Sequence, residues 1–259
     1  MYVGLAWHFW NTRWRRGSAA KGLQAWERSA LLAPLALHGW LLYEGIFSGE
    51  LRFGFAQALS VMMFFGIALY WIESLFYSLE GMQPLLLPLA ALAVPLPALF
   101  PGLASSAVHA HSVAFKLHLA LAMVAYSLFV IALLHATLMA VAERQLHRKS
   151  AVVLSGLPPL LTLERLLFRV IGAAFVFLTL TLATGIAFSE TLFGRPLRLD
   201  HKTVFAILSW GAFGWLLAGR WLYGWRGRTA LRWTLTGFAM LLLAYVGSRF
   251  VLEVVLERP

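Results

Sequence analysis

The sequence predicts an all-α protein, a polytopic membrane helical bundle with seven full transmembrane helices and a partial N-terminal helix. Of its 259 residues, 61% are hydrophobic and only 12% are charged, whereas soluble domains are about half apolar and about a quarter charged. The apolar residues form runs close to the ~20 residues that a helix needs to cross a bilayer. Lys and Arg gather in short segments between these runs, as membrane topology requires.

The N-terminus predicts only part of a span. Residues 1–10 are apolar, but they are too short to cross ~30 Å of hydrocarbon. They lack the basic start and the small-residue cleavage site of a signal peptide. We expect the second half of a transmembrane helix whose first half lies upstream, with a short interfacial anchor as the alternative.

Seven later stretches have the length and character of membrane spans. They cover residues 29–47, 53–72, 84–100, 115–142, 160–188, 203–222 and 233–252. The stretch 84–100 contains four prolines, so we expect a kinked or broken helix there. Glu73 and Glu80 are expected to mark the turn before it. Together these elements predict a single integral membrane domain over residues 1–259.

The basic residues predict an orientation. Segments 11–28, 143–169 and 220–232 hold fourteen of the 21 Lys and Arg residues, and alternation of the spans places all three on the same side. The positive-inside rule makes that side cytoplasmic. The sequence therefore predicts a multi-pass protein of the bacterial inner membrane with a periplasmic C-terminus.

The composition excludes several classes of function. The chain has no cysteine, which excludes disulfides, thiol catalysis, iron–sulfur clusters and Cys-ligated zinc. Its net charge of +10 is divided among loops, so we expect membrane lipid and no nucleic acid as a partner. No nucleophile–base pair or carboxylate dyad is visible, so no catalytic residue is predicted and a non-enzymatic role is favoured.

Two histidines inside predicted spans are candidate metal ligands. His118 lies in the first turn of the 115–142 helix and His38 near the middle of the 29–47 helix. Ionisable residues are rare in membrane spans, and two imidazoles on facing helices can provide both axial ligands of haem iron. Alternatively, each histidine bonds a carbonyl or hydroxyl group of a neighbouring helix.

Other residues allow two interpretations each. Ala122, Ala125 and Phe129 follow His118 on one helix face, where small side chains leave room for a flat ligand or for close helix packing. Asp200 is expected to cap the helix that follows it. Arg249 either extends to the membrane surface or pairs with an acidic ligand group such as a propionate. His109 and His111 are expected in a loop.

Five segments together resemble the cytochrome c assembly (CcsA-type) integral membrane family, particularly its small YpjD-like and HemX-like members. They read KLHLALAMVAYSLF, ERLLFRVIG, LDHKTVFAILSW, GWRGR and LLLAYVGSRF. The resemblance covers residues 25–255, and it implies an eight-helix bundle. In this comparison His118 matches the first outer histidine of the haem lyases. The second outer histidine is absent near residues 244–245, and a membrane histidine is absent near residue 218.

The resemblance implies a protein that binds or handles haem and assists cytochrome c maturation or haem delivery. With the residues singled out above, it predicts a cofactor site formed by His118, His38, Arg249, Asp200 and His201, with His118 and His38 on the haem iron. His38 has no assured counterpart in the haem lyases but is the natural second ligand here. Asp200 and His201 match the end of a tryptophan-rich motif whose tryptophans are replaced by LFGRPLRL. The alternative is a membrane scaffold or regulator of haem biosynthesis or respiratory complex assembly that binds no haem. A transporter is a third alternative, indicated only by the proline-rich stretch.

Overall fold

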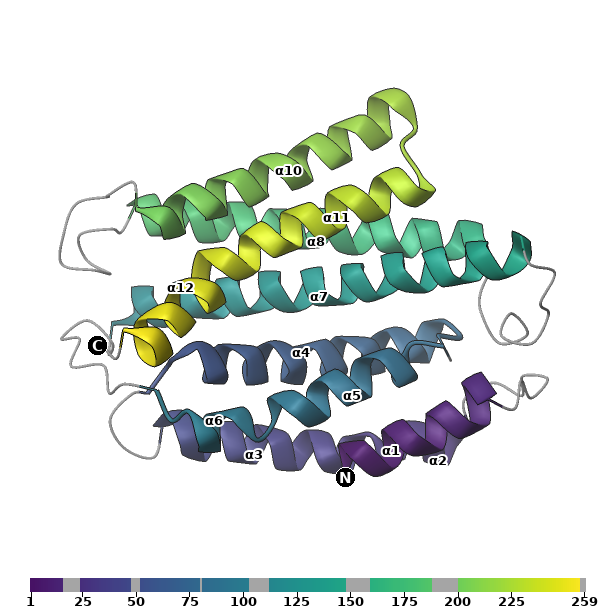
Figure 1. The fold of residues 1–259 in the computed structure, drawn as a ribbon, viewed down its shortest axis with the longest axis horizontal. Helices are drawn as coiled ribbons and strands as arrows, with labels where there is room; N and C mark the ends of the chain where they lie inside the picture. Colours follow the sequence, from purple (N-terminus) through teal and green to yellow (C-terminus); the bar gives the residue numbers. More distant parts are fainter. Residues whose placement is uncertain are drawn as a thin grey trace.

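The computed structural model describes residues 1–15, 24–47, 52–79, 81–102, 112–147, 159–187 and 200–256. Every regular element in these ranges is helical, which confirms the all-α prediction. The long helices run side by side along the long axis of the molecule (Figure 1). This is the arrangement of a helical bundle.

The N-terminal half of the bundle contains short helices around one long one. Its elements are α1 (Tyr2–Phe9), η1 (Trp10–Arg15), α2 (Ala25–Ala30), α3 (Leu32–Phe47), α4 (Phe55–Phe76), α5 (Gln83–Ala93) and α6 (Leu96–Leu99). The N-terminal helix continues through η1, five residues beyond the predicted apolar stretch. The interruption between α5 and α6 confirms the broken helix that the prolines predicted.

The C-terminal half consists of long helices. Its elements are α7 (Val113–His147), α8 (Leu160–Ala187), α10 (His201–Tyr223), α11 (Gly227–Leu242), η3 (Leu243–Gly247), α12 (Ser248–Phe250) and η4 (Val251–Val255). The last four follow one another without a gap and form one helix with two π-helical segments. Such wide turns are rare and occur frequently at functional sites. The end at which α7 and α10 begin is called the His118 end below.

Several predicted boundaries were wrong. The last helix begins at Gly227 rather than at residue 233. Glu73 does not mark a turn, because α4 continues through Phe76 and places Glu73 inside the helix. The helix expected to end at residue 142 continues to His147, since Glu, Arg, Gln and Leu are good helix formers that extend it past the apolar stretch. Hydropathy therefore located the apolar part of each helix rather than its end. Glu80, His109 and His111 lie outside the described residues.

Five of the described helices are long and apolar enough to cross a membrane. They are Phe55–Phe76, Val113–Arg144, Leu160–Ala187, His201–Tyr223 and Gly227–Val255. The protein is therefore a multi-pass membrane protein. Helix α3, with 16 residues, and the segment Gln83–Leu99 are shorter, so the count of seven full spans remains a prediction.

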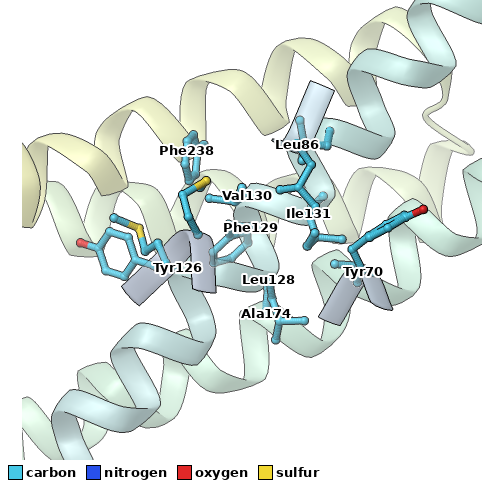
Figure 2. Packing of buried hydrophobic residues seen from close by; sticks show 14 of the residues in the cluster. Tyr70, Leu86, Tyr126, Leu128, Phe129, Val130, Ile131, Ala174 and Phe238 are labelled. Carbon is cyan, nitrogen blue, oxygen red and sulfur yellow. The ribbon is translucent and has the colours of Figure 1, made fainter. Parts of the chain in front are cut away.

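Helix α7 lies at the centre of the bundle, where it packs against α4, α8 and α11. The Phe129 ring on α7 stacks on Phe213 of α10, with ring centroids 3.8 Å apart. Figure 2 shows Phe129 and Ile131 of α7 in the same apolar cluster as Phe238 of α11 and Tyr70 of α4. In lipid, helices associate through such packing because water does not drive apolar surfaces together there. The core therefore fixes α7 against the N-terminal half as well as against the other helices of the C-terminal half.

Candidate functional site

A cavity of about 370 Å³ opens at the His118 end between α7, α8, α10 and the C-terminal helix. Its wall is mostly apolar, and its polar or charged members are His118, Tyr126, Thr181, Lys202, Thr203, Tyr245 and Arg249. Cofactor sites typically have volumes of about 300–1,000 Å³ and apolar walls with a few polar groups. The cavity has the size and lining of such a site.

His118 lies in the second turn of α7, and its ring is held by α8. Its Nδ1 is 3.0 Å from the Thr184 hydroxyl oxygen. When that hydroxyl donates its proton to the carbonyl of Leu180 at 2.8 Å or Thr181 at 3.0 Å, it accepts a hydrogen bond from Nδ1–H. In the neutral ring Nε2 then carries the lone pair. Metal-bound imidazoles in proteins are oriented in this way by a bond from the other nitrogen.

Small residues make room beside the imidazole. A Cβ at Gly185 would lie 3.3 Å from His118 Cε1, so glycine lets α8 pass close to the ring. Ala122, one turn after His118, lines the cavity. Ala125 and Phe129 are fully buried in the core. The two interpretations of this helix face therefore apply to different turns, with space near His118 and close packing deeper in the bundle.

Two cations line the cavity, Lys202 from α10 and Arg249 from α12. The Arg249 guanidinium is 4.0 Å from a carboxylate oxygen of Glu253 one turn later. Guanidinium groups bind carboxylates and phosphates through paired hydrogen bonds. The arrangement suits an amphipathic ligand with a flat apolar body and anionic groups.

Glu253 also fastens the C-terminal helix to the start of α4. Its Oε2 accepts a hydrogen bond of 3.4 Å from the Phe55 amide, where the helix dipole favours a negative charge. Gly54 has no side chain to obstruct this contact, and a Cβ there would overlap the carboxylate. Tyr245 adds a hydrogen bond of 3.4 Å to the Phe53 carbonyl. Sequence reasoning missed Glu253, for which the only signal was its i,i+4 spacing from Arg249.

Asp200 caps α10, as predicted. Its carboxylate accepts hydrogen bonds from the Thr203 amide at 2.9 Å and the Thr203 hydroxyl at 3.0 Å. Burial opposes ionisation, but these bonds and the nearby charges of Lys202 and His201 outweigh it and lower the pKa of Asp200. Neither Asp200 nor His201 is among the residues that line the cavity. Their role in cofactor binding stays a prediction.

His38 lies in α3, and α3 and α7 lie on opposite sides of α4 (Figure 1). Its side chain is buried, with Nε2 2.9 Å from the Ser60 hydroxyl and Nδ1 3.4 Å from the Tyr2 hydroxyl. It is not among the residues that line the cavity. Of the two candidate ligands, the structure brings only His118 into the cavity. Haem ligation by His38 stays a prediction.

The arrangement defines a class of protein, a helical membrane protein with a cavity between its spans. The chain belongs to the Cytochrome C assembly protein family, whose sequence pattern it matches over residues 26–256. This range agrees closely with the predicted 25–255.

Three relatives are informative. The inner membrane protein YpjD of Escherichia coli K12 is 36% identical over 138 residues, which cover 53% of this chain and 52% of that protein. The chain thus spans about half the length of this relative. An uncharacterized 28.8 kDa protein of Azospirillum brasilense is 31% identical over 93% of this chain and 90% of its own. The cytochrome c biogenesis protein CcsA of Trichodesmium erythraeum is 31% identical over 33% of this chain and 24% of its own. No solved structure matches the chain.

Proposed function

We propose that the protein binds haem in the cavity around His118 and takes part in cytochrome c maturation. The observation that carries this proposal is the position of His118, whose Nδ1 lies 3.0 Å from the Thr184 hydroxyl in a cavity that also has two cations in its wall. Membership of the Cytochrome C assembly protein family supports the biological context.

The residues around the cavity fit the chemistry of haem. Neutral imidazole is a common axial ligand of haem iron, and His118 supplies one. Arg249 and Lys202 supply positive charge for the propionate groups. The apolar wall suits the macrocycle, and Thr184 holds the imidazole in the tautomer that ligation requires. Bound haem would supply an iron whose properties depend on this ligand and on the polarity of the wall.

An absorption spectrum tests the proposal. The protein is expressed with haem available, purified in detergent and examined for a Soret band. We expect the band in the wild type and its loss or shift in His118→Ala. His8→Gln is the matched control, since it removes an imidazole from the opposite end while glutamine can still bond Glu27. A wild type without a Soret band contradicts haem binding, and an unchanged spectrum in His118→Ala contradicts the assignment of the ligand.

The orientation of the protein is also part of the proposal. We infer that the His118 end faces the periplasm, because two thirds of the basic residues lie in segments assigned to the opposite side. An alkaline phosphatase fusion at the C-terminus is then active, and a fusion after residue 147 is inactive. The reverse pattern would place the cavity on the cytoplasmic side.

A scaffold or regulatory role is the second candidate, and one observation favours it. His38 bonds two hydroxyl groups of the same chain, so among the described residues His118 is the one histidine that lines the cavity. If the protein is a scaffold, its affinity purification should recover a defined protein partner whether or not haem is present. Recovery of no partner, together with a Soret band that depends on His118, excludes this candidate.

A further inference from the structure

Away from the cavity, α4 and α7 bring together two ionisable side chains inside the bundle. Nε2 of His135 lies 3.5 Å from Oε2 of Glu73. The His135 side chain is fully buried, whereas that of Glu73 is 18% exposed. Within the part of the chain that the structure describes, neither of the two facing atoms has a hydrogen-bond partner. Ionisable pairs within membrane spans are rare and are functional candidates by default.

The position of one proton follows from the backbone. Nδ1 of His135 is 3.0 Å from the carbonyl oxygen of Ile131. A carbonyl oxygen can only accept a hydrogen bond, so Nδ1 must carry a proton. In a neutral imidazole the Nε2 atom, which faces Glu73, therefore has a lone pair and no proton.

This tautomer restricts the protonation of the pair. If Glu73 were ionised and His135 neutral, two lone pairs would face each other and a negative charge would lie unpaired among apolar side chains. Such a charge is strongly destabilising. One additional proton removes both problems, because it forms O–H···N if it resides on Glu73 and N–H···O if it resides on His135. Both arrangements hold the same number of protons and are neutral overall.

We propose that Glu73 and His135 form a binding site for a single proton within the bundle. The site keeps its proton at a pH at which glutamate and histidine in water have lost theirs, above about pH 7. The carboxyl group of Glu73 is the partly exposed member of the pair and is the route by which the proton exchanges. This function is separate from the His118 cavity and does not depend on haem binding.

Neighbouring charges do not replace this proton. At the end of the bundle opposite the His118 end, the surrounding segments carry further titratable groups. They are Arg28 in α2, Tyr70 in α4 and Tyr77 directly after it, Glu143 and Arg144 in α7, Glu164, Arg165 and Arg169 in α8, and Arg228 and Arg232 in α11. The described part of α5 carries none. Arg169 donates to the Tyr77 hydroxyl at 3.3 Å, and Glu164 is paired with Arg220. Within the described residues, none of these side chains bonds Glu73 or His135.

Spectroscopy of the wild-type protein in detergent tests the proposal at about pH 8, where free glutamate and histidine have lost their protons. Infrared spectroscopy detects a protonated carboxyl group, and nitrogen NMR of ¹⁵N-histidine-labelled protein detects an imidazolium ring. We expect one of these two signals. A carboxyl signal should disappear in Glu73→Gln, and an imidazolium signal in His135→Gln. Glu143→Gln is the matched control on α7 and should preserve the signal.

Absence of both signals in the wild type overturns the proposal without any variant. A signal that persists in both Glu73→Gln and His135→Gln overturns it as well, because the proton then resides elsewhere. If the variants do not fold, reaction of the wild type with a hydrophobic carbodiimide assigns a carboxyl signal, since this reagent modifies protonated carboxyl groups. Mass spectrometry should then find Glu73 modified, and modification only at other carboxyl groups contradicts the proposal.

Discussion

His38 and His118 occupy opposite halves of the bundle and have different surroundings. His38 is enclosed, with both ring nitrogens close to hydroxyl groups of Tyr2 and Ser60. His118 is held through Nδ1 by Thr184 and borders a cavity. Both are histidines in apolar helices, so the residue type alone does not distinguish a structural histidine from a candidate ligand.

The difference arises from the size of the neighbouring side chains. Around His38, the rings of Phe64 and Tyr2 lie 5.6 and 5.8 Å from the imidazole and fill the space. Around His118, Ala122 borders the open space of the cavity, and Gly185 lets α8 approach the ring without a side chain between them. An enclosed histidine should contribute mainly to stability, and one beside a cavity mainly to binding.

Substitution of the two histidines should have the largest effect and tests this comparison directly. We expect His38→Leu to lower the free energy of unfolding by about 2–3 kcal/mol, because it leaves the buried hydroxyl groups of Ser60 and Tyr2 without partners. His118→Leu should change it by less than about 1 kcal/mol, since its neighbourhood is open. Chemical unfolding in detergent, followed by tryptophan fluorescence, measures both. Equal losses would remove the distinction between the halves.

Two alanines of α7 sharpen the comparison within a single helix. Ala125→Leu should destabilise the protein by about 1–3 kcal/mol, because a fully buried position cannot accept three more carbons without strain. Ala122→Leu should be nearly neutral in stability, because its side chain extends into the cavity, but it should abolish the Soret band. Thermal unfolding and the absorption spectrum separate the two effects. A destabilised Ala122→Leu would show that the cavity is smaller than described.

The contact between Glu253 and α4 joins the two halves and should have a moderate effect. Gly54→Ala displaces the carboxylate from the Phe55 amide and should cost about 1 kcal/mol, the scale of one charge at a helix N-terminus. Glu253→Gln should cost a similar amount. Because both changes disrupt one contact, the double variant should lose no more than either single variant. Additive losses would indicate that the two residues act independently.

The smallest expected effect is a pH dependence that differs between the halves. Burial raises the pKa of Glu27, but hydrogen bonds from the Gln24 amide and His8 and the charge of Arg13 outweigh it, so the net pKa is lowered. A carboxyl group with a lowered folded pKa stabilises the protein above its ordinary pKa, and this contribution disappears as the pH falls through the folded value. Unfolding midpoints of the wild type should therefore decrease at acid pH, and Glu27→Gln should reduce this slope.

Asp200 provides the matched control at the His118 end. Its pKa is also lowered, but its side chain is exposed and asparagine caps helices about as well as aspartate. Asp200→Asn should therefore change stability little at neutral pH. A loss of stability in Asp200→Asn larger than that in Glu27→Gln would contradict the expectation that the Glu27 carboxylate contributes more to stability than the Asp200 carboxylate.

Much of the fold was predictable because apolar runs, prolines and basic loops are local signals. The broken helix at α5 and α6 and the cap at Asp200 follow from the residues at those positions. The cavity was not predictable in the same way, because Gly185, Ala206 and Ala244 contribute to it from separate helices. His38 and His118 were both predicted as ligands, and the neighbours of each ring show which of them borders the cavity. Glu73 was assigned to a turn because hydropathy does not reveal that His135 lies opposite it.

The two π-helical segments of the C-terminal helix determine which side chains face the cavity. Each segment holds more residues per turn than an α-helix, so the side chains after it point in different directions than in a regular helix. Arg249 lies between the two segments, after η3. Deletion of one residue from η3 would rotate every later side chain by about 100°, moving the guanidinium away from the cavity and Glu253 away from α4. The winding of this one helix therefore controls both the charge in the cavity wall and the contact between the two halves.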